Sequence, residues 1–362
     1  MSLITPLGPL STLDLTSPAT QQEILGYDKH QLLEGLVVEA VGERYISGMA
    51  RHPLAELADV VLFRAKQKQA QSGAWFHWPR TTNAIALELA SCLSKKFPRE
   101  VVLCRYDPSS GDFLTAYPDN HEKKVQELLA KIRGIQKFTV DYFTKPQGNV
   151  QIPERMLEAF WGNLRSAYGG KLIDEVILPR LFKNFAVQPF FTWGWDVDRI
   201  FSYRSQLWQL ELKHKYPFVS RNGLSFGINK GQVSLIKDLA DSSINTLHLV
   251  MVKPVWSDQI SPGYLHTRPE LRKKVAFLAK VIDRAEANRL NSLKGSTSGG
   301  NTTFNGRGRL KYVPVNIKEF HQIGTYEDDV DAVLERILSL LDGGYSSPAN
   351  DSLLQSLRLT NI

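Results

Sequence analysis

Two neighbouring stretches of sequence decide the fold: WGWDVDRIF at residues 193–201 and WQLELKHK at residues 208–215. In both stretches the type of side chain alternates along the sequence, as is typical of β-strands, whose successive side chains point to opposite faces of a sheet. In the second stretch the leucines point into a core, so Glu211 and Lys213 lie together on the other face. The sequence therefore predicts two adjacent strands with charged side chains gathered on one face.

The charged residues of these predicted strands have a definite chemical use. Asp196 and Asp198 share a face of the first strand, and the spacing from Asp198 to Glu211 suits a hairpin that brings the strands side by side. Carboxylate oxygens suit a hard cation such as Mg²⁺ or Mn²⁺, which polarises a phosphoryl oxygen and lowers the pKa of a bound water. A lysine beside that water, here Lys213, would orient it or stabilise the charge that develops on phosphorus. The structural alternative is a surface pairing of Glu211 with Lys213 beside a solvated Asp198.

This arrangement resembles the PD-(D/E)XK nuclease superfamily, whose fold is found in many restriction enzymes and repair or recombination nucleases. The resemblance covers about residues 170–253 and rests on the order helix, strand with Asp, strand with Glu-x-Lys, helix, strand. Asp198 matches the metal-binding aspartate, and Glu211 and Lys213 match the Glu-x-Lys element, although no proline precedes Asp198. The resemblance implies that these three residues are catalytic, that the two carboxylates hold the metal, and that cleavage leaves a 5′-phosphate and a 3′-hydroxyl.

The resemblance also implies roles for four further residues. Glu175, in the preceding predicted helix, matches an extra acidic metal ligand of many members, and Asp196 is the alternative to it. Gln232, at the start of the following predicted helix, matches a catalytic glutamine that several branches keep near the scissile phosphate. Lys230 would share that role.

The charge distribution favours a polyanionic partner. The 362 residues carry a net charge of +7, and residues 253–311 alone hold twelve basic residues against four acidic ones. Such a stretch can follow a phosphate backbone. The residues we expect to contact nucleic acid are Lys230, Lys273, Lys274, Arg307 and Arg309. The alternative is a solvated helix face, because Lys273, Lys274, Lys280 and Arg284 have helical spacing.

The fold class predicted from these patterns is α/β, with a restriction-endonuclease-like mixed sheet flanked by helices. An N-terminal α+β region at residues 1–148 would bind nucleic acid or a partner. The nuclease core would cover residues 149–345, with residues 253–311 as a basic insertion, before a polar tail at 346–362. The expected elements include helices at 31–41, 52–71 and 172–182 and a single strand at 192–203.

The cysteines and the apolar runs predict the compartment. Two cysteines without a CxxC pair exclude a disulfide scaffold and a cysteine zinc site, and they fit a reducing compartment. No apolar run approaches the ~20 residues that span a bilayer, and the N-terminus lacks the basic start and apolar core of a signal peptide. We therefore expect a cytoplasmic protein without a membrane partner.

Two groups of aromatic residues are candidates for stacking on unpaired bases. Residues 75–80 read WFHWPR and lie near several basic residues, but the pattern favours a core edge or a partner patch. Trp193 and Trp195 flank the predicted site, and there packing on the sheet is favoured.

Together these patterns predict a metal-dependent endonuclease that hydrolyses DNA in restriction, defence, repair or recombination. A homodimer or a larger nucleoprotein complex is compatible with that function. Two alternatives stay open: a non-catalytic nucleic-acid-binding or assembly subunit that keeps the fold, and an RNA-directed nuclease.

Overall fold

The chain forms two compact units that exchange segments. The computed structural model describes residues 2–66, 73–117, 121–132, 143, 146–148, 151–191, 193–258, 260–301 and 309–360. The first unit is drawn from Met1–Leu33 and Ala58–Val197, and the second from Glu34–Leu57, Asp198–Asn301 and Arg309–Ile362. The predicted boundary at residue 148 therefore falls inside the first unit, and residues 34–57 fold with the C-terminal half.

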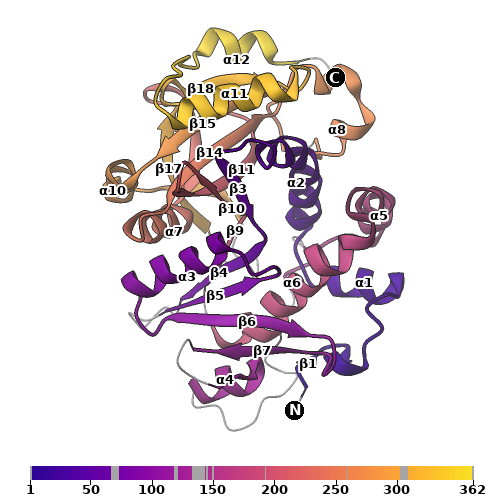
Figure 1. Ribbon diagram of the computed structural model, residues 1–362. Coiled ribbons are helices and arrows are strands. Elements are labelled where there is room, and N and C mark those ends of the chain that lie inside the picture. Colours follow the sequence, from indigo (N-terminus) through magenta and orange to yellow (C-terminus); the bar gives the residue numbers. More distant parts are fainter. Residues whose placement is uncertain are drawn as a thin grey trace. The chain divides into compact units, whose positions relative to one another are not determined.

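The first unit is built on a six-stranded sheet with the order β8-β7-β6-β5-β4-β9 (Figure 1). Its strands are β4 (Val60–Lys66), β5 (Gly73–Pro79), β6 (Val101–Asp107), β7 (Asp112–Ala116), β8 (Lys123–Lys124) and β9 (Trp193–Val197). β5 and β6 are parallel, and α3 (Ala84–Lys96) connects them. The remaining elements are β1 (Ile4–Thr5), β2 (Gly8–Pro9), α1 (Pro18–Leu25), α4 (Val125–Ile132), α5 (Glu154–Tyr168) and α6 (Leu178–Leu181). Short 3-10 or π-helical segments are Leu10–Thr12, Gly169–Lys171, Ile173–Ile177, Phe182–Val187 and Gln188–Phe190.

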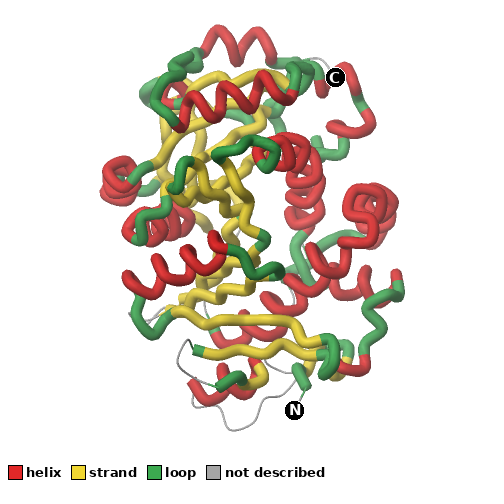
Figure 2. The backbone as a smooth tube through the Cα atoms, viewed as in Figure 1, coloured by secondary structure: helices red, strands yellow, loops and turns green. Residues whose placement is uncertain are grey.

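The second unit contains two sheets flanked by helices (Figure 2). The larger sheet has the order β18-β15-β14-β11-β10-β3, with β3 (Ala55–Ala58), β10 (Arg199–Tyr203), β11 (Gln206–Lys215), β14 (Asn245–Val252), β15 (Ala276–Ile282) and β18 (His321–Thr325). The smaller sheet has the order β12-β13-β17-β16, with β12 (Phe218–Ser220), β13 (Gly223–Asn229), β16 (Ser296–Asn301) and β17 (Arg309–Asn316). The helices are α2 (His30–Met49), α7 (Lys230–Asp241), α8 (Tyr264–Thr267), α9 (Pro269–Arg272), α10 (Arg284–Ser292), α11 (Val330–Leu341) and α12 (Asp351–Leu357).

The two faces of the larger sheet pack against different elements. On one face Leu210 and Leu212 belong to a hydrophobic core with residues of α2 and α11. On the other face Val250 of β14 packs in a second core with Phe226 of β13 and with α7, which forms the crossover between the parallel strands β11 and β14. Glu211 alternates with the two leucines, so it lies on this second face.

Helix α2 approaches β11 closely at Gly42. A Cβ atom at this position would lie 2.5 Å from Cδ2 of Leu212, so glycine is what allows the approach. Leu212 is only 7% exposed and is packed in the core, which leaves it little room to move. The absence of a side chain at Gly42 therefore sets the distance between the helix and the sheet.

We predict that Gly42→Ala lowers the free energy of unfolding by about 1–3 kcal/mol, which is typical of an overpacked core. Gly35→Ala is the matched control in the same helix, because the nearest atom to its added Cβ would be Oε1 of Glu39 at 4.0 Å. Alanine favours helices over glycine by about 1 kcal/mol, so the control should be neutral or stabilising. Urea unfolding measures both variants, and equal effects would contradict the close approach at Gly42.

The general class is as predicted: the protein is a mixed α/β structure with sheets flanked by helices. The helix predicted at 52–71 is wrong, because this segment forms β3 and β4. The apolar run Val60–Phe63 is rich in β-branched and aromatic residues, which favours a strand. None of the described helices is both long and apolar enough to cross a membrane.

A further prediction from spacing is also wrong. The single strand expected at 192–203 is interrupted at Asp198, and its parts β9 and β10 belong to different sheets, so Asp196 and Asp198 do not share a strand face. The alternative interpretation of the basic stretch, a solvated helix face that includes Lys280, does not apply, because β15 occupies Ala276–Ile282 and Lys280 in it is buried. In the predicted polar tail, α12 contributes the buried Leu354 to a core.

Candidate active site

A tight hairpin brings the predicted catalytic residues together. β10 and β11 are antiparallel and joined by Arg204 and Ser205, whose φ angles of 49° and 62° give the left-handed backbone that two-residue hairpins favour. The resulting register pairs Arg199 with Leu210. Asp198, one residue before β10, therefore lies beside β11, and its Oδ2 accepts a hydrogen bond from the Leu212 amide at 3.1 Å.

The ammonium group of Lys213 contacts both carboxylates. Its Nζ lies 3.5 Å from Oδ2 of Asp198 and forms an ion pair with Oε1 of Glu211. The other oxygen of Glu211 accepts a hydrogen bond of 2.8 Å from Nε2 of the buried Gln209. The side chain of Glu211 is 2% exposed, whereas those of Asp198 and Lys213 are 16% and 30% exposed. The cluster thus has a buried end at Glu211 and a solvent-accessible end at Asp198 and Lys213.

The charges of this cluster are strongly coupled. Burial, together with the nearby Asp198, raises the pKa of Glu211 to about 7. Burial works against the charged form of Lys213, but Asp198 and Glu211 hold the pKa of this lysine above its ordinary value. Burial and the charge of Lys213 lower the pKa of Lys215 to about 8, and its Nζ donates to the Gly227 carbonyl at 2.7 Å. Lys213 is therefore the cation that balances the two carboxylates.

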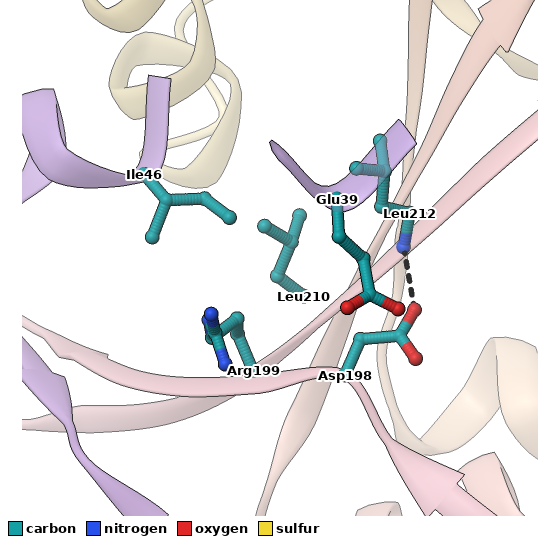
Figure 3. A pocket seen from close by; sticks show the side chains of 6 residues that line it. All are labelled: Glu39, Ile46, Asp198, Arg199, Leu210 and Leu212. Carbon is teal, nitrogen blue, oxygen red and sulfur yellow. Dashed lines mark hydrogen bonds between the residues drawn. The ribbon is translucent and has the colours of Figure 1, made fainter. Parts of the chain in front are cut away.

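A third carboxylate, which the sequence reasoning missed, belongs to Glu39 of α2. Figure 3 shows its carboxylate next to that of Asp198, at one end of a small pocket. The pocket is lined by Glu39, Ile46, Asp198, Arg199, Leu210 and Leu212. Glu39 is exposed, and its charge contributes to the raised pKa of Lys213. The sequence carries no local signal for this residue, because more than 150 positions separate it from Asp198.

Glu175 and Asp196, the predicted additional ligands, belong to the first unit and have ion-pair partners there. Asp196 lies 2.7 Å from Nζ of Lys183 and 3.3 Å from the guanidinium of Arg180. Burial opposes its ionisation, but these two cations hold the pKa of Asp196 below its ordinary value. Glu175 lies 3.9 Å from Nζ of Lys171. Neither residue is part of the cluster around Lys213 in the second unit.

The two residues predicted near the scissile phosphate lie in the first turn of α7. Lys230 donates from Nζ to the backbone carbonyls of Asn291 at 2.5 Å and Leu293 at 2.9 Å, so it tethers the end of α10. Gln232 is buried, and among the described residues no hydrogen bond joins it to the Lys213 cluster. Their assignment to substrate contact stays a prediction from the resemblance.

The basic stretch is partly neutralised within the second unit. Lys280 is buried and lies 2.9 Å from Glu286 and 3.2 Å from Glu319. Lys273 is exposed and Lys274 is half-buried, so both can face a ligand. Arg307 and the side chain of Arg309 lie outside the described residues. Among the described side chains of the predicted nucleic-acid surface, Lys273 is thus exposed, and Lys230 and Lys274 are half-buried.

The donor set around Lys213 fits a magnesium ion that is also held by substrate. The described residues contain no group of three His, Cys, Asp or Glu side chains arranged to hold a metal. Mg²⁺ in phosphoryl-transfer sites is commonly bound by only one or two carboxylates, with waters and substrate phosphates completing the shell. Asp198 and Glu211 both contact one ammonium nitrogen, so these two oxygens are closer than the ~8 Å beyond which they could not share an ion.

Comparison of the chain with protein-family models, with curated proteins and with solved structures gives no match. The geometry and charge of the Lys213 cluster are therefore the features of this chain that point to a function.

We predict that ionisation of Glu211 destabilises the metal-free protein as the pH rises. Its folded-state pKa of about 7 lies above the ordinary value of 4.5, so its contribution to stability is complete below pH 4.5 and is lost as the pH rises through 7. In Glu211→Gln this loss is absent. Between pH 5 and 8 the unfolding free energy of wild type should fall relative to the variant by roughly 1–3 kcal/mol.

Denaturant unfolding in EDTA at a series of pH values measures this difference. A constant offset between wild type and Glu211→Gln across the range would contradict the raised pKa of Glu211.

Proposed function

We propose that this protein is a metal-dependent nuclease that hydrolyses phosphodiester bonds in DNA. The observation that carries the proposal is the convergence of Asp198, Glu211 and Lys213, with the lysine ammonium in contact with both carboxylates. A buried carboxylate with a half-buried aspartate and lysine beside it is costly as a purely structural device. It is well suited to hold a cation against a phosphate group.

The order of elements around the cluster supports the proposal. Asp198 precedes β10, β11 carries Glu211 and Lys213, and α7 and the parallel strand β14 follow. This is the order of strand, strand, helix and strand expected from the resemblance to PD-(D/E)XK nucleases. Helix α2 packs on the face of the sheet that carries Leu210 and Leu212, and its Glu39 lines the same pocket as Asp198.

Each residue of the cluster would have a separate role in hydrolysis. Asp198 and Glu211 would hold Mg²⁺ or Mn²⁺, which when bound supplies positive charge to polarise the scissile phosphate and acidify a water. Lys213 is protonated, so it donates hydrogen bonds that orient the attacking water and stabilise negative charge on the phosphate. The water oxygen forms a bond to phosphorus, and the bond from phosphorus to the 3′-oxygen breaks. The water gives up a proton and the leaving 3′-oxygen takes one up, so the products are a 5′-phosphate and a 3′-hydroxyl. Gln209 keeps Glu211 in position through its hydrogen bond.

The key test is the cleavage of plasmid DNA and of single-stranded DNA by Lys213→Ala with Mg²⁺ or Mn²⁺. We predict that the rate falls by about 10²–10³-fold, the usual effect of removing a group that stabilises transition-state charge. Lys237→Ala is the matched control, because Lys237 is 31% exposed against 30% for Lys213 and pairs with Asp241 at 2.7 Å. The control should cleave like wild type, and EDTA should abolish cleavage in all proteins.

Equal cleavage by wild type and Lys213→Ala would contradict the catalytic role of Lys213. Binding of DNA without any cleavage by wild type would favour the non-catalytic subunit instead. Preferential cleavage of RNA in competition with DNA would favour the RNA-directed alternative.

A second prediction concerns metal binding, which is measured without any cleavage reaction. Glu39→Gln should weaken Mn²⁺ binding in isothermal titration calorimetry by about 5-fold, because one charge beside Asp198 contributes roughly 1 kcal/mol at a solvated site. Glu43→Gln is the control one turn further along α2, where Glu43 pairs with Arg199 at 3.4 Å. Lys213→Ala should still bind Mn²⁺, since it removes a competing cation. Equal weakening by the Glu39 and Glu43 variants would contradict the place of Glu39 beside the metal.

The proposal extends to assembly and location. Cleavage of both strands of a duplex is favoured by two paired active sites, so a homodimer or a larger nucleoprotein complex would suit this function. Cys92 and Cys104 are both free thiols, which is consistent with the reducing cytoplasm.

A further inference from the structure

Two tryptophans stand in parallel on β9, the edge strand of the sheet in the first unit. The ring planes of Trp193 and Trp195 are inclined by only 1°, and their centroids are 6.1 Å apart. This separation is close to the ~6.6 Å rise of two strand residues, as expected for neighbouring side chains on one face of a strand. Trp193 is 40% exposed, and neither indole is among the buried core residues. Packing on the sheet, which was expected of both rings, thus leaves a substantial part of Trp193 open to solvent.

The opposite side of β9 shows how the local packing is satisfied without these rings. A Cβ atom at Gly194 would lie 2.2 Å from the Phe63 ring, so the phenyl group covers the β9 backbone on that side. Asp196, which alternates onto the same side, pairs with Lys183 and Arg180. The tryptophans therefore lie on the side away from Phe63, where Trp193 keeps a large aromatic surface open to solvent.

A cationic side chain accompanies the outer indole. In the antiparallel ladder of β4 and β9, Lys66 lies directly opposite Trp193, and the two side chains share one face of the sheet. Lys66 is half-buried. An exposed aromatic plate with a lysine beside it is the combination that stacks on a base and contacts the adjoining phosphate.

We propose that Trp193, backed by Trp195, is a stacking site for the bases of unpaired nucleic acid. A planar base can extend the parallel pair by lying on the open face of Trp193. Base pairs in a duplex offer no such free face, so the site distinguishes single-stranded from double-stranded substrate. The inference rests on the proposed function only in taking nucleic acid as the ligand, because none of its residues belongs to the Lys213 cluster.

The test is the binding of a fluorescein-labelled 15-nucleotide oligo(dT) to the full chain, measured by anisotropy in EDTA so that no cleavage occurs. Trp193→Ala should weaken binding about 5- to 100-fold, as expected for the loss of one stacked base. Trp193→Phe should restore most of the affinity, because it keeps an aromatic face. The slope of log affinity against log salt should be the same for wild type and Trp193→Ala, because stacking neutralises no phosphate.

Two controls make the result specific. Leu87→Ala removes another exposed apolar side chain of the first unit, 62% exposed on α3, and should bind oligo(dT) like wild type. A labelled 15-base-pair duplex should bind equally to wild type and Trp193→Ala. A thermal melt verifies that each variant is folded.

Unchanged oligo(dT) affinity in Trp193→Ala would overturn the proposal. Equal losses for oligo(dT) and duplex, or no binding of oligo(dT) by wild type, would overturn it as well. These outcomes are distinguishable from a failure of the nuclease proposal, which is decided by cleavage in Lys213→Ala.

Discussion

The ammonium group shared by Asp198 and Glu211 is the interaction on which the rest of the candidate site depends. A carboxylate as deeply buried as Glu211 is stable only when paired and hydrogen-bonded. Lys213 supplies the charge from two residues further along the same strand, and Gln209 supplies the hydrogen bond from two residues before. Period-two alternation thus delivers all three side chains to one face of β11. The hairpin turn then fixes the register that adds Asp198.

The part of the site that lies within one hairpin could be predicted from the sequence. The alternation of leucine with Gln209, Glu211 and Lys213 is a local pattern, and so is the spacing back to Asp198. The pattern does not indicate that the chain passes from one sheet to another at Asp198, because the alternation of side chains continues through Asp196 without interruption. The assignment of Asp196 to the same face failed for this reason.

The long-range part of the site could not be predicted from spacing. Glu175 is the closer carboxylate to Asp198 in the sequence, but the carboxylate that shares the pocket with Asp198 is that of Glu39 in α2. A close helix-to-strand approach at Gly42 depends on the partner Leu212, which only the folded chain identifies. The same limit applies to charge. The net charge of residues 253–311 follows from the sequence, but Glu319, which pairs with Lys280, lies outside that stretch.

The pairing of β3 with β10 has an evolutionary consequence. These strands are neighbours in the larger sheet, yet β3 ends at Ala58 and β10 begins at Arg199. The chain therefore leaves the second unit after β3, forms most of the first unit, and returns to the second unit in the strand next to β3. Two adjacent strands can equally be joined by a short turn. A gene could therefore gain, lose or exchange the segment between β3 and β10 while the larger sheet of the second unit keeps its order of strands.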